Sequence, residues 1–399
     1  MEWTDHSKAQ VDAQLKRVQA SAAFENAGRM SPLLEYLVCA ATTGRGNSLN
    51  QTAIAVDVLG RDSDFDPQTD SIVRVEIGRL RAKLHEYYAT DGINDDIRIE
   101  LPKGRYQPIL HVPPALESEP LPTQTINYCK TDDGVTLAYG VMGEGPPIIK
   151  TATWLTHLEI DIRVRTWQHY ARALSHGRKL IRYDGRNMGM SERRVSNFNF
   201  EAMIHDLETV ADAAGVDRFP IFGTSQGVSV AIAYAARYPE RVSKLILAGG
   251  FLQGPRVANV PEALEFADAI ETSIRYGWQK PESHFRQLLC RSLLPEGSEE
   301  DFRELDELQM ASCDVEDIQA IVDHVHTIDV AEEAKQVRAP TLILHATNEM
   351  IPMIAARQIA ATIPNSKIVE LESRNHLIQA KEPAWPVMVS AMNDFLAEP

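Results

Sequence analysis

The chain has 399 residues, of which 44% are hydrophobic and 24% are charged, and its formal net charge is −16. This composition is typical of a globular protein with a large core, and the length is enough for two or three domains. The acidic balance argues against tight nonspecific binding to nucleic acid, and no apolar run approaches the roughly 18 residues that span a membrane.

The sequence also predicts a cytoplasmic location. The first residues, Met1–Asp5, lack the basic and then apolar pattern of a signal peptide. No C-x-x-C spacing connects the four cysteines, so we interpret them as reduced thiols and not as a disulfide frame or a zinc site: Cys39, Cys129, Cys290 and Cys313. No phosphate-binding loop or dinucleotide fingerprint is present, so no cofactor is expected.

The first segment, residues 1–110, is predicted to be mainly helical, with two helices over 9–43 and a short one over 52–59. A further helix is predicted over 72–88, because Val73, Ile77, Leu80, Leu84 and Tyr87 recur on one face. Basic residues fall on its other face: Arg74, Arg79, Arg81 and Lys83. Two strands, 97–101 and 105–109, are predicted to form a hairpin whose tip carries Lys103 and Arg105.

The helix over 73–84 and the hairpin after it resemble the recognition helix and wing of response-regulator output domains of the OmpR/PhoB type. The resemblance implies a winged helix-turn-helix domain that binds an operator in DNA. It implies contacts from six residues: Arg74, Arg79, Arg81, Lys83, Lys103 and Arg105. The alternative is a small protein-interaction domain whose charges form a solvated helix face. The segment holds 13 basic and 16 acidic residues, which argues against very tight nonspecific binding.

Residues 111–124 are rich in proline and acidic residues, which predicts a semi-rigid linker before a second domain over 125–399. From Ile126 onward, strands alternate with helices, which predicts an α/β fold with a mainly parallel sheet covered on both faces. The strand pattern stops over about 254–337, where a helical cap is predicted. Within this cap, Asp323-His324-Val325-His326 is interpreted as a solvated helix face and not as a metal site.

The central motif is Gly223-Thr224-Ser225-Gln226-Gly227, which has the spacing G-x-S-x-G. It follows an apolar strand, 218–222, and precedes an Ala-rich helix, 228–236. This order is typical of a nucleophile elbow, in which a serine stands on a sharp turn between strand and helix. Small residues are needed on both sides of such a turn, so we predict Ser225 as a catalytic nucleophile.

The order of strands, elbow, helical insertion and a late histidine resembles the α/β-hydrolase superfamily over about residues 125–397. The resemblance implies that His376, just after the last predicted strand, is the general base. It places the acid in the loop before Pro352, which is one residue shorter than the D-x-x-V-P loop of the superfamily. Counting back from Pro352 gives Asn348 and counting forward from His345 gives Glu349, and we choose Glu349 because it carries a charge. The alternative is a degenerate triad.

The same resemblance implies an oxyanion hole built from the backbone N–H of Gln226 and an N–H near Thr153 or Trp154. The superfamily's usual His-Gly pair is absent from the latter loop, where Trp154–Glu159 stands instead. With Arg182–Asp184 and Asp206–Glu208, this loop is similar to a hydrolase subgroup often fused to bacterial signalling or DNA-binding modules.

Two functional hypotheses follow. The leading one is a homodimeric transcriptional regulator whose hydrolase domain binds, and slowly hydrolyses or only senses, a small apolar ester or lactone. The alternative is an active serine esterase or lactonase whose N-terminal domain mediates association. Whether such a regulator would activate or repress, and which ligand it would take, is left open by the sequence.

Overall fold

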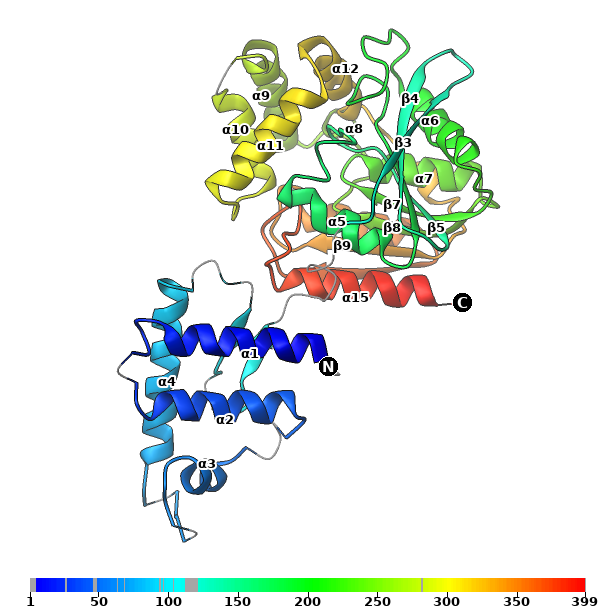
Figure 1. Cartoon of the computed structure of the whole chain (residues 1–399). Helices are drawn as coiled ribbons and strands as arrows, with labels where there is room; N and C mark the ends of the chain where they lie inside the picture. The colour runs from blue at the N-terminus through cyan, green and yellow to red at the C-terminus, as the bar shows by residue number, and fades with distance from the viewer. Residues whose placement is uncertain are drawn as a thin grey trace. The chain divides into compact units, whose positions relative to one another are not determined.

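The computed structural model describes residues 5–25, 27–45, 49–62, 64–67, 69–92, 95, 97–102, 104–111, 121–280 and 283–398. The chain divides into two compact units, Met1–Ser118 and Glu119–Pro399 (Figure 1). Among the described residues, no helix combines the length and the apolar composition that a membrane crossing requires.

The described residues of the N-terminal unit form four helices followed by a two-stranded antiparallel sheet. The elements are α1 (Asp5–Ala20), α2 (Met30–Thr42), α3 (Gln51–Asp57), α4 (Ile72–Ala89), β1 (Arg98–Glu100) and β2 (Ile109–His111). The predicted stripe on α4 is buried in the core of this unit against residues of α1, α2 and α3, among them Leu33, Leu34 and Ile54. Asn50 caps α3 by accepting a hydrogen bond from the Ala53 N–H at 2.9 Å.

The predicted second strand of the hairpin, 105–109, is wrong, because pairing begins only at Ile109, opposite Glu100. Pro108 has no N–H to offer to a partner strand. In addition, the Arg81 side chain donates hydrogen bonds to the Leu101 carbonyl at 2.7 Å and to the Pro102 carbonyl at 3.0 Å. These carbonyls therefore accept hydrogen bonds from Arg81 of α4 and not from a partner strand.

The second unit is built on an eight-stranded sheet with the order β10-β9-β8-β7-β5-β6-β4-β3. Its strands are β3 (Thr125–Lys130), β4 (Thr136–Met142), β5 (Pro147–Lys150), β6 (Lys179–Tyr183), β7 (Phe219–Thr224), β8 (Val242–Ala248), β9 (Thr341–Ala346) and β10 (Ser366–Leu371). All neighbouring pairs from β10 to β6 are parallel, whereas β4 pairs antiparallel with β6 and with β3. The predicted α/β architecture is confirmed as a mixed sheet.

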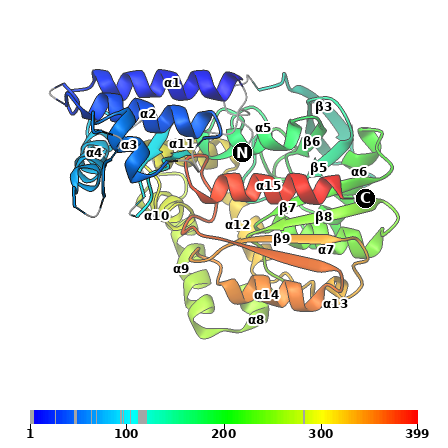
Figure 2. The ribbon, with the colours of Figure 1, turned by 90° about the horizontal axis from the view of Figure 1, so that it is seen from below.

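Helices cover both faces of this sheet (Figure 2). On one face, α5 (Arg165–Ser175) and α15 (Ala384–Ala397) meet through the rings of Tyr170 and Trp385, whose centroids are 4.8 Å apart. The other layer holds α6 (Phe200–Ala213), α7 (Gly227–Arg237), α13 (Ala331–Ala334) and α14 (Met353–Thr362), which contact one another in sequence around the sheet. The core strands are buried between the two layers, as their near-continuous apolar sequences require.

The segment between β8 and β9 forms the predicted helical cap (Figure 1). Its helices are α8 (Pro255–Ala258), α9 (Pro261–Gly277), α10 (His284–Leu293), α11 (Glu299–Ser312) and α12 (Val315–Val325). Side chains cap three of these helices at their N-termini: Ser283, Ser298 and Asp314. The chain enters and leaves the cap side by side, because Gln253 pairs with Asp329 in an antiparallel bridge.

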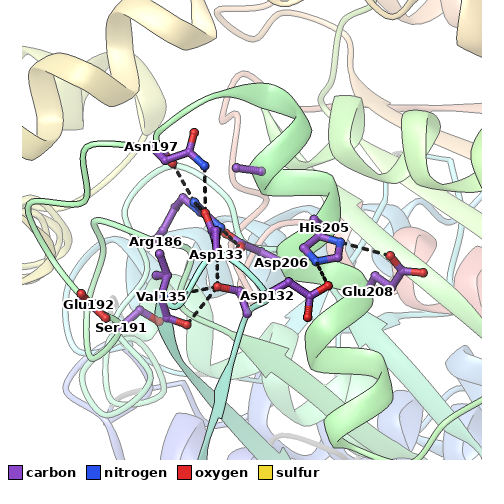
Figure 3. A network of polar contacts seen from close by, with 12 residues as sticks. Asp132, Asp133, Val135, Arg186, Ser191, Glu192, Asn197, His205, Asp206 and Glu208 are labelled. Atoms are coloured by element: carbon purple, nitrogen blue, oxygen red, sulfur yellow. Dashed lines mark hydrogen bonds and ion pairs between the residues drawn. The ribbon is translucent and has the colours of Figure 1, made fainter.

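A buried ion network fixes the loop that follows β6 (Figure 3). The Arg186 guanidinium donates two hydrogen bonds to the Asp206 carboxylate of α6, at 2.6 and 2.9 Å. It also donates to Asp133, in the turn between β3 and β4, and to the Asn197 carbonyl. Arg186 and Asp206 are each 1% exposed, so one side chain joins three segments inside the protein.

Candidate active site

Ser225 stands between β7 and α7 with a backbone φ of +52°. A positive φ is a strained conformation for a residue with a side chain, and it is characteristic of a nucleophile elbow. A Cβ atom at Gly223 would lie 2.9 Å from the Gly227 carbonyl oxygen. A Cβ at Gly227 would lie 2.4 Å from the Thr151 hydroxyl oxygen. Both glycines of the motif are therefore required by close packing around the turn.

The structure brings His376 and Glu349 together. His376 Nδ1 is hydrogen-bonded to Glu349 Oε2, and the two side chains are 2% and 1% exposed. The other ring nitrogen, Nε2, is buried and has no partner among the described residues, so it is available to accept a proton. The alternative acid, Asn348, is exposed and its amide donates to the Thr347 hydroxyl at 3.2 Å. Of the two candidates, Glu349 is thus the one in contact with the histidine.

The acid loop is held by neighbours that the sequence analysis did not single out. His345 Nε2 lies 3.3 Å from Glu349 Oε1 and 2.9 Å from the Ile351 carbonyl oxygen. Because a carbonyl only accepts, this nitrogen carries the proton and donates it to the Ile351 carbonyl. Gly249 has a φ of +58°, and a Cβ there would lie 3.0 Å from His376 Cε1 and 3.2 Å from Glu349 Oε1. Space beside the pair therefore depends on a glycine.

The predicted oxyanion residues lie beside the elbow. Gln226 is the N-cap of α7, where backbone N–H groups have no carbonyl within the helix to bind. The loop after β5 is fixed to the elbow strand because the Thr153 hydroxyl donates to the Thr224 carbonyl at 2.8 Å. Thr153 and Trp154 line the same cavity as Ser225. The two segments that carry the predicted oxyanion donors are thus held together beside the serine.

The cavity beside Ser225 is open on one side, and the space between its walls is about 340 Å³ when the adjoining solvent is included. Its walls are mostly apolar and come from the loop after β5, from α5, from the cap and from the loop that carries the histidine: Thr153, Trp154, Leu155, Trp167, Ser225, Leu293, Leu305, Gln309, His376 and Leu377. The cap is bound directly to the loop that carries His376, since the backbone N–H of His376 donates to the Leu293 carbonyl of α10 at 2.9 Å.

One wall of the cavity contacts a buried amine. Lys150 Nζ lies 4.8 Å from the centre of the Trp167 ring, over its face. Burial lowers the pKa of Lys150 to about 8, although Asp161 nearby favours the charged form. The Lys150 amine and the Trp167 ring are thus packed together at this wall of the cavity.

The predicted DNA-contacting residues have different surroundings. Arg81 was predicted to contact DNA, and in the structure it is half-buried and donates hydrogen bonds to the Leu101 and Pro102 carbonyls. Two other predicted residues form ion pairs on α4. Arg79 pairs with Glu76 at 2.9 Å, and Lys83 pairs with Glu86 at 2.8 Å. Arg74 and Arg105 are exposed, and Lys103 lies outside the described residues.

The two histidines of the segment Asp323–His326 are less solvated than predicted. His326 is 8% exposed and its Nδ1 lies 2.7 Å from Glu271, and the His324 ring stacks on Phe200. Among the described residues, no group of three or more His, Cys, Asp or Glu side chains could hold a metal ion.

The sheet order, the elbow after β7, the cap between β8 and β9 and the late histidine together define the α/β-hydrolase class of fold. The sequence matches the alpha/beta hydrolase fold family over residues 160–383, and the chain belongs to this family.

Individual relatives are distant. The chain is 24% identical over 268 residues to pyrrolizixenacetamide deacetylase of Xenorhabdus hominickii, a match that covers 65% of this chain and 94% of the relative. It is 24% identical over 276 residues to 2-hydroxy-6-oxo-2,4-heptadienoate hydrolase of Pseudomonas putida, covering 64% and 87%. The crystal structure of the enol-lactonase from Burkholderia xenovorans has a TM-score of 0.54 at 21% identity and covers 68% of this chain and 100% of that one. The two sequence relatives are named as hydrolytic enzymes, whereas the structural likeness, at 21% identity, shows the fold alone.

Proposed function

We propose that the protein is a serine hydrolase that cleaves a small, mainly apolar ester or lactone. The observation that carries the proposal is the buried pair of His376 and Glu349 beside a strained Ser225, with a free Nε2 in a shared cavity. The named relatives include a deacetylase and an enol-lactonase, which supports acyl transfer as the reaction type.

Each residue has a definite role in this reaction. Ser225 Oγ attacks the carbonyl carbon while His376 Nε2 takes the hydroxyl proton, and Glu349 stabilises the imidazolium that forms. The negative charge on the carbonyl oxygen is stabilised by backbone N–H groups of Gln226 and Trp154. The proton passes from His376 to the leaving alcohol, and a water molecule then releases the acid by the same steps in reverse.

The test is hydrolysis of p-nitrophenyl butyrate by the wild type and by Ser225→Ala. We expect kcat to fall by at least about 10⁴-fold, because removal of a nucleophile leaves only the catalysis due to binding and the oxyanion hole. Ser229→Ala is the matched control, since this buried serine lies one turn further along α7 and its hydroxyl donates to the Phe251 carbonyl. A fluorophosphonate probe should add once to the wild type and not to Ser225→Ala, measured by intact mass. A folded wild type with neither turnover nor labelling would refute the proposal.

A second proposal concerns the N-terminal unit, as a DNA-binding domain that would make the protein a cytoplasmic, homodimeric regulator responding to the hydrolase ligand. It is supported by the exposed Arg74 and Arg105 and by the order of α4 and the hairpin. The test is fluorescence anisotropy on DNA from upstream of the protein's own gene, at several salt concentrations, together with the mass in solution. Arg74→Glu should weaken binding and reduce its salt dependence. The absence of a specific complex, with or without hydrolysed esters, would reject this role.

A further inference from the structure

The apolar cavity contains two buried polar atoms that the catalytic steps do not use. Trp154 Nε1 is a donor and Gln309 Oε1 is an acceptor, and each is buried without a hydrogen-bond partner among the described residues. Both side chains line the cavity that Ser225 and His376 share. Buried polar groups are usually paired, so two orphans in one ligand cavity indicate that a ligand group pairs with them.

Gln309 is held firmly in the cap. It is 1% exposed, it lies on α11 one turn after Leu305, and its Nε2 donates to Cys290 Sγ at 2.9 Å. Burial raises the pKa of the Cys290 thiol to about 12, so the thiol keeps its proton. A thiol can donate as well as accept, and with the amide turned over Gln309 would present its NH₂ to the cavity instead. In either orientation the glutamine offers one hydrogen bond that the protein leaves unmade.

The chemistry of these atoms selects the ligand group. Trp154 needs an acceptor, and Gln309 needs a donor, or an acceptor if the amide is reversed. A hydroxyl is the smallest group that both donates and accepts, so it satisfies either atom in either orientation. An alkyl chain at the same place would leave both atoms desolvated and unpaired, which costs binding free energy.

We propose that Gln309 and Trp154 form a recognition point for a hydroxyl group, so that the preferred substrates are hydroxylated esters or lactones and not plain alkyl esters. This inference rests on the proposed hydrolase function. Gln309 is its specificity-determining residue, because Trp154 also contributes its backbone to the oxyanion site.

The experiment compares three esters in a pH-stat: ethyl butyrate, ethyl 3-hydroxybutyrate and 2-hydroxyethyl butyrate. The second and third carry the hydroxyl on the acyl and on the alcohol side. We expect one of them to exceed ethyl butyrate in kcat/KM by about 10-fold or more in the wild type, since sites built to bind a hydroxyl reject analogues without it. In Gln309→Leu, this ratio should fall to about one or below, because the variant removes the polar partner and keeps the volume.

The ratio is measured within each variant, so a loss of stability does not affect it. Gln319→Leu is the control, since Gln319 lies on the neighbouring cap helix α12 and its amide bonds to Asp323. Equal kcat/KM for all three esters in the wild type, or an unchanged ratio in Gln309→Leu, would overturn the inference. Hydrolysis of p-nitrophenyl butyrate that depends on Ser225 is measured alongside. If this hydrolysis occurs but no hydroxyl preference is found, only the recognition point is rejected. If this hydrolysis does not occur, the hydrolase function is rejected as well.

Discussion

Replacement of Arg186 by methionine should strongly destabilise the second unit. The substitution keeps an extended apolar side chain but removes the guanidinium that binds Asp206 and Asp133 (Figure 3). Asp206 is 1% exposed and would retain a buried charge without its partner. Breaking a buried ion pair from one side costs about 3–5 kcal/mol, because the remaining charge is desolvated and uncompensated.

An exposed ion pair in the same unit gives the matched control. Arg237 pairs with Glu201 at 2.7 Å, but the two side chains are 41% and 69% exposed. Arg237→Met should therefore cost less than about 1 kcal/mol, since water screens the pair and replaces its hydrogen bonds. Unfolding in urea, followed by tryptophan fluorescence, reports on the second unit because four of the five tryptophans belong to it.

The loss in Arg186→Met should also depend on pH. Burial already raises the pKa of Asp206, and the hydrogen bonds from Arg186 oppose that shift. Without Arg186 the pKa of Asp206 rises further. At pH 5 the folded variant then binds a proton at Asp206, whereas the unfolded chain, in which the pKa of an aspartate is about 3.9, does not. The variant should thus be less destabilised at pH 5 than at pH 8. Adding Asp206→Leu should restore most of the stability. Equal losses in Arg186→Met and Arg237→Met, or a loss independent of pH, would refute this reasoning.

Three further predictions concern the catalytic pair, the glycine beside it and the buried Lys150. Glu349→Gln should lower kcat on p-nitrophenyl butyrate by about 10³–10⁴-fold with little change in folding, because a neutral amide cannot stabilise the His376 imidazolium; activity within 10-fold of the wild type would contradict this role. Gly249→Ala should lower kcat at least about 10-fold in the same assay, since its Cβ would displace His376, and an unchanged kcat would show that the loop adjusts freely. Lys150→Met should be more stable than the wild type at pH 7 by up to about 3 kcal/mol, because the pKa of Lys150 is about 8 in the folded state and near 10.4 in the unfolded state. The loss of the contact between the ammonium and Trp167 should reduce this gain. This advantage should shrink by pH 10, where the folded wild type has lost the buried charge, and urea unfolding that shows the same difference at both pH values would argue against it.

Local patterns predicted much of the fold. The stripe on α4 and the strands around the elbow were legible because helical and extended periodicities repeat within a few residues. The helix α14 was missed, although the parallel pairing of β9 and β10 requires a crossover between them. The end of the hairpin was misplaced because it depends on Arg81, which reaches it from another element.

The candidate site was only partly legible for the same reason. Ser225 and His376 follow from motif and order, but the choice between Asn348 and Glu349 depends on how a shortened loop turns, and this is set by tertiary contacts. His345 could have been suspected, since it lies near the end of β9, four residues before Glu349. Gln309 gave no signal, because a glutamine in an amphipathic cap helix looks the same whether it faces solvent or a cavity.

The position of the cap within the chain affects how the protein is made. The nucleophile lies on β7, before the cap, whereas the acid and the base follow β9 and β10, after it. A growing chain therefore contains Ser225 before the ribosome has added Glu349 and His376. Pairing of β9 with β8 closes the long connection through the cap, and the loop-closure entropy of this connection is lost at that step. Until that step, the chain has a serine without a base, so synthesis yields no hydrolytic activity before the sheet is complete.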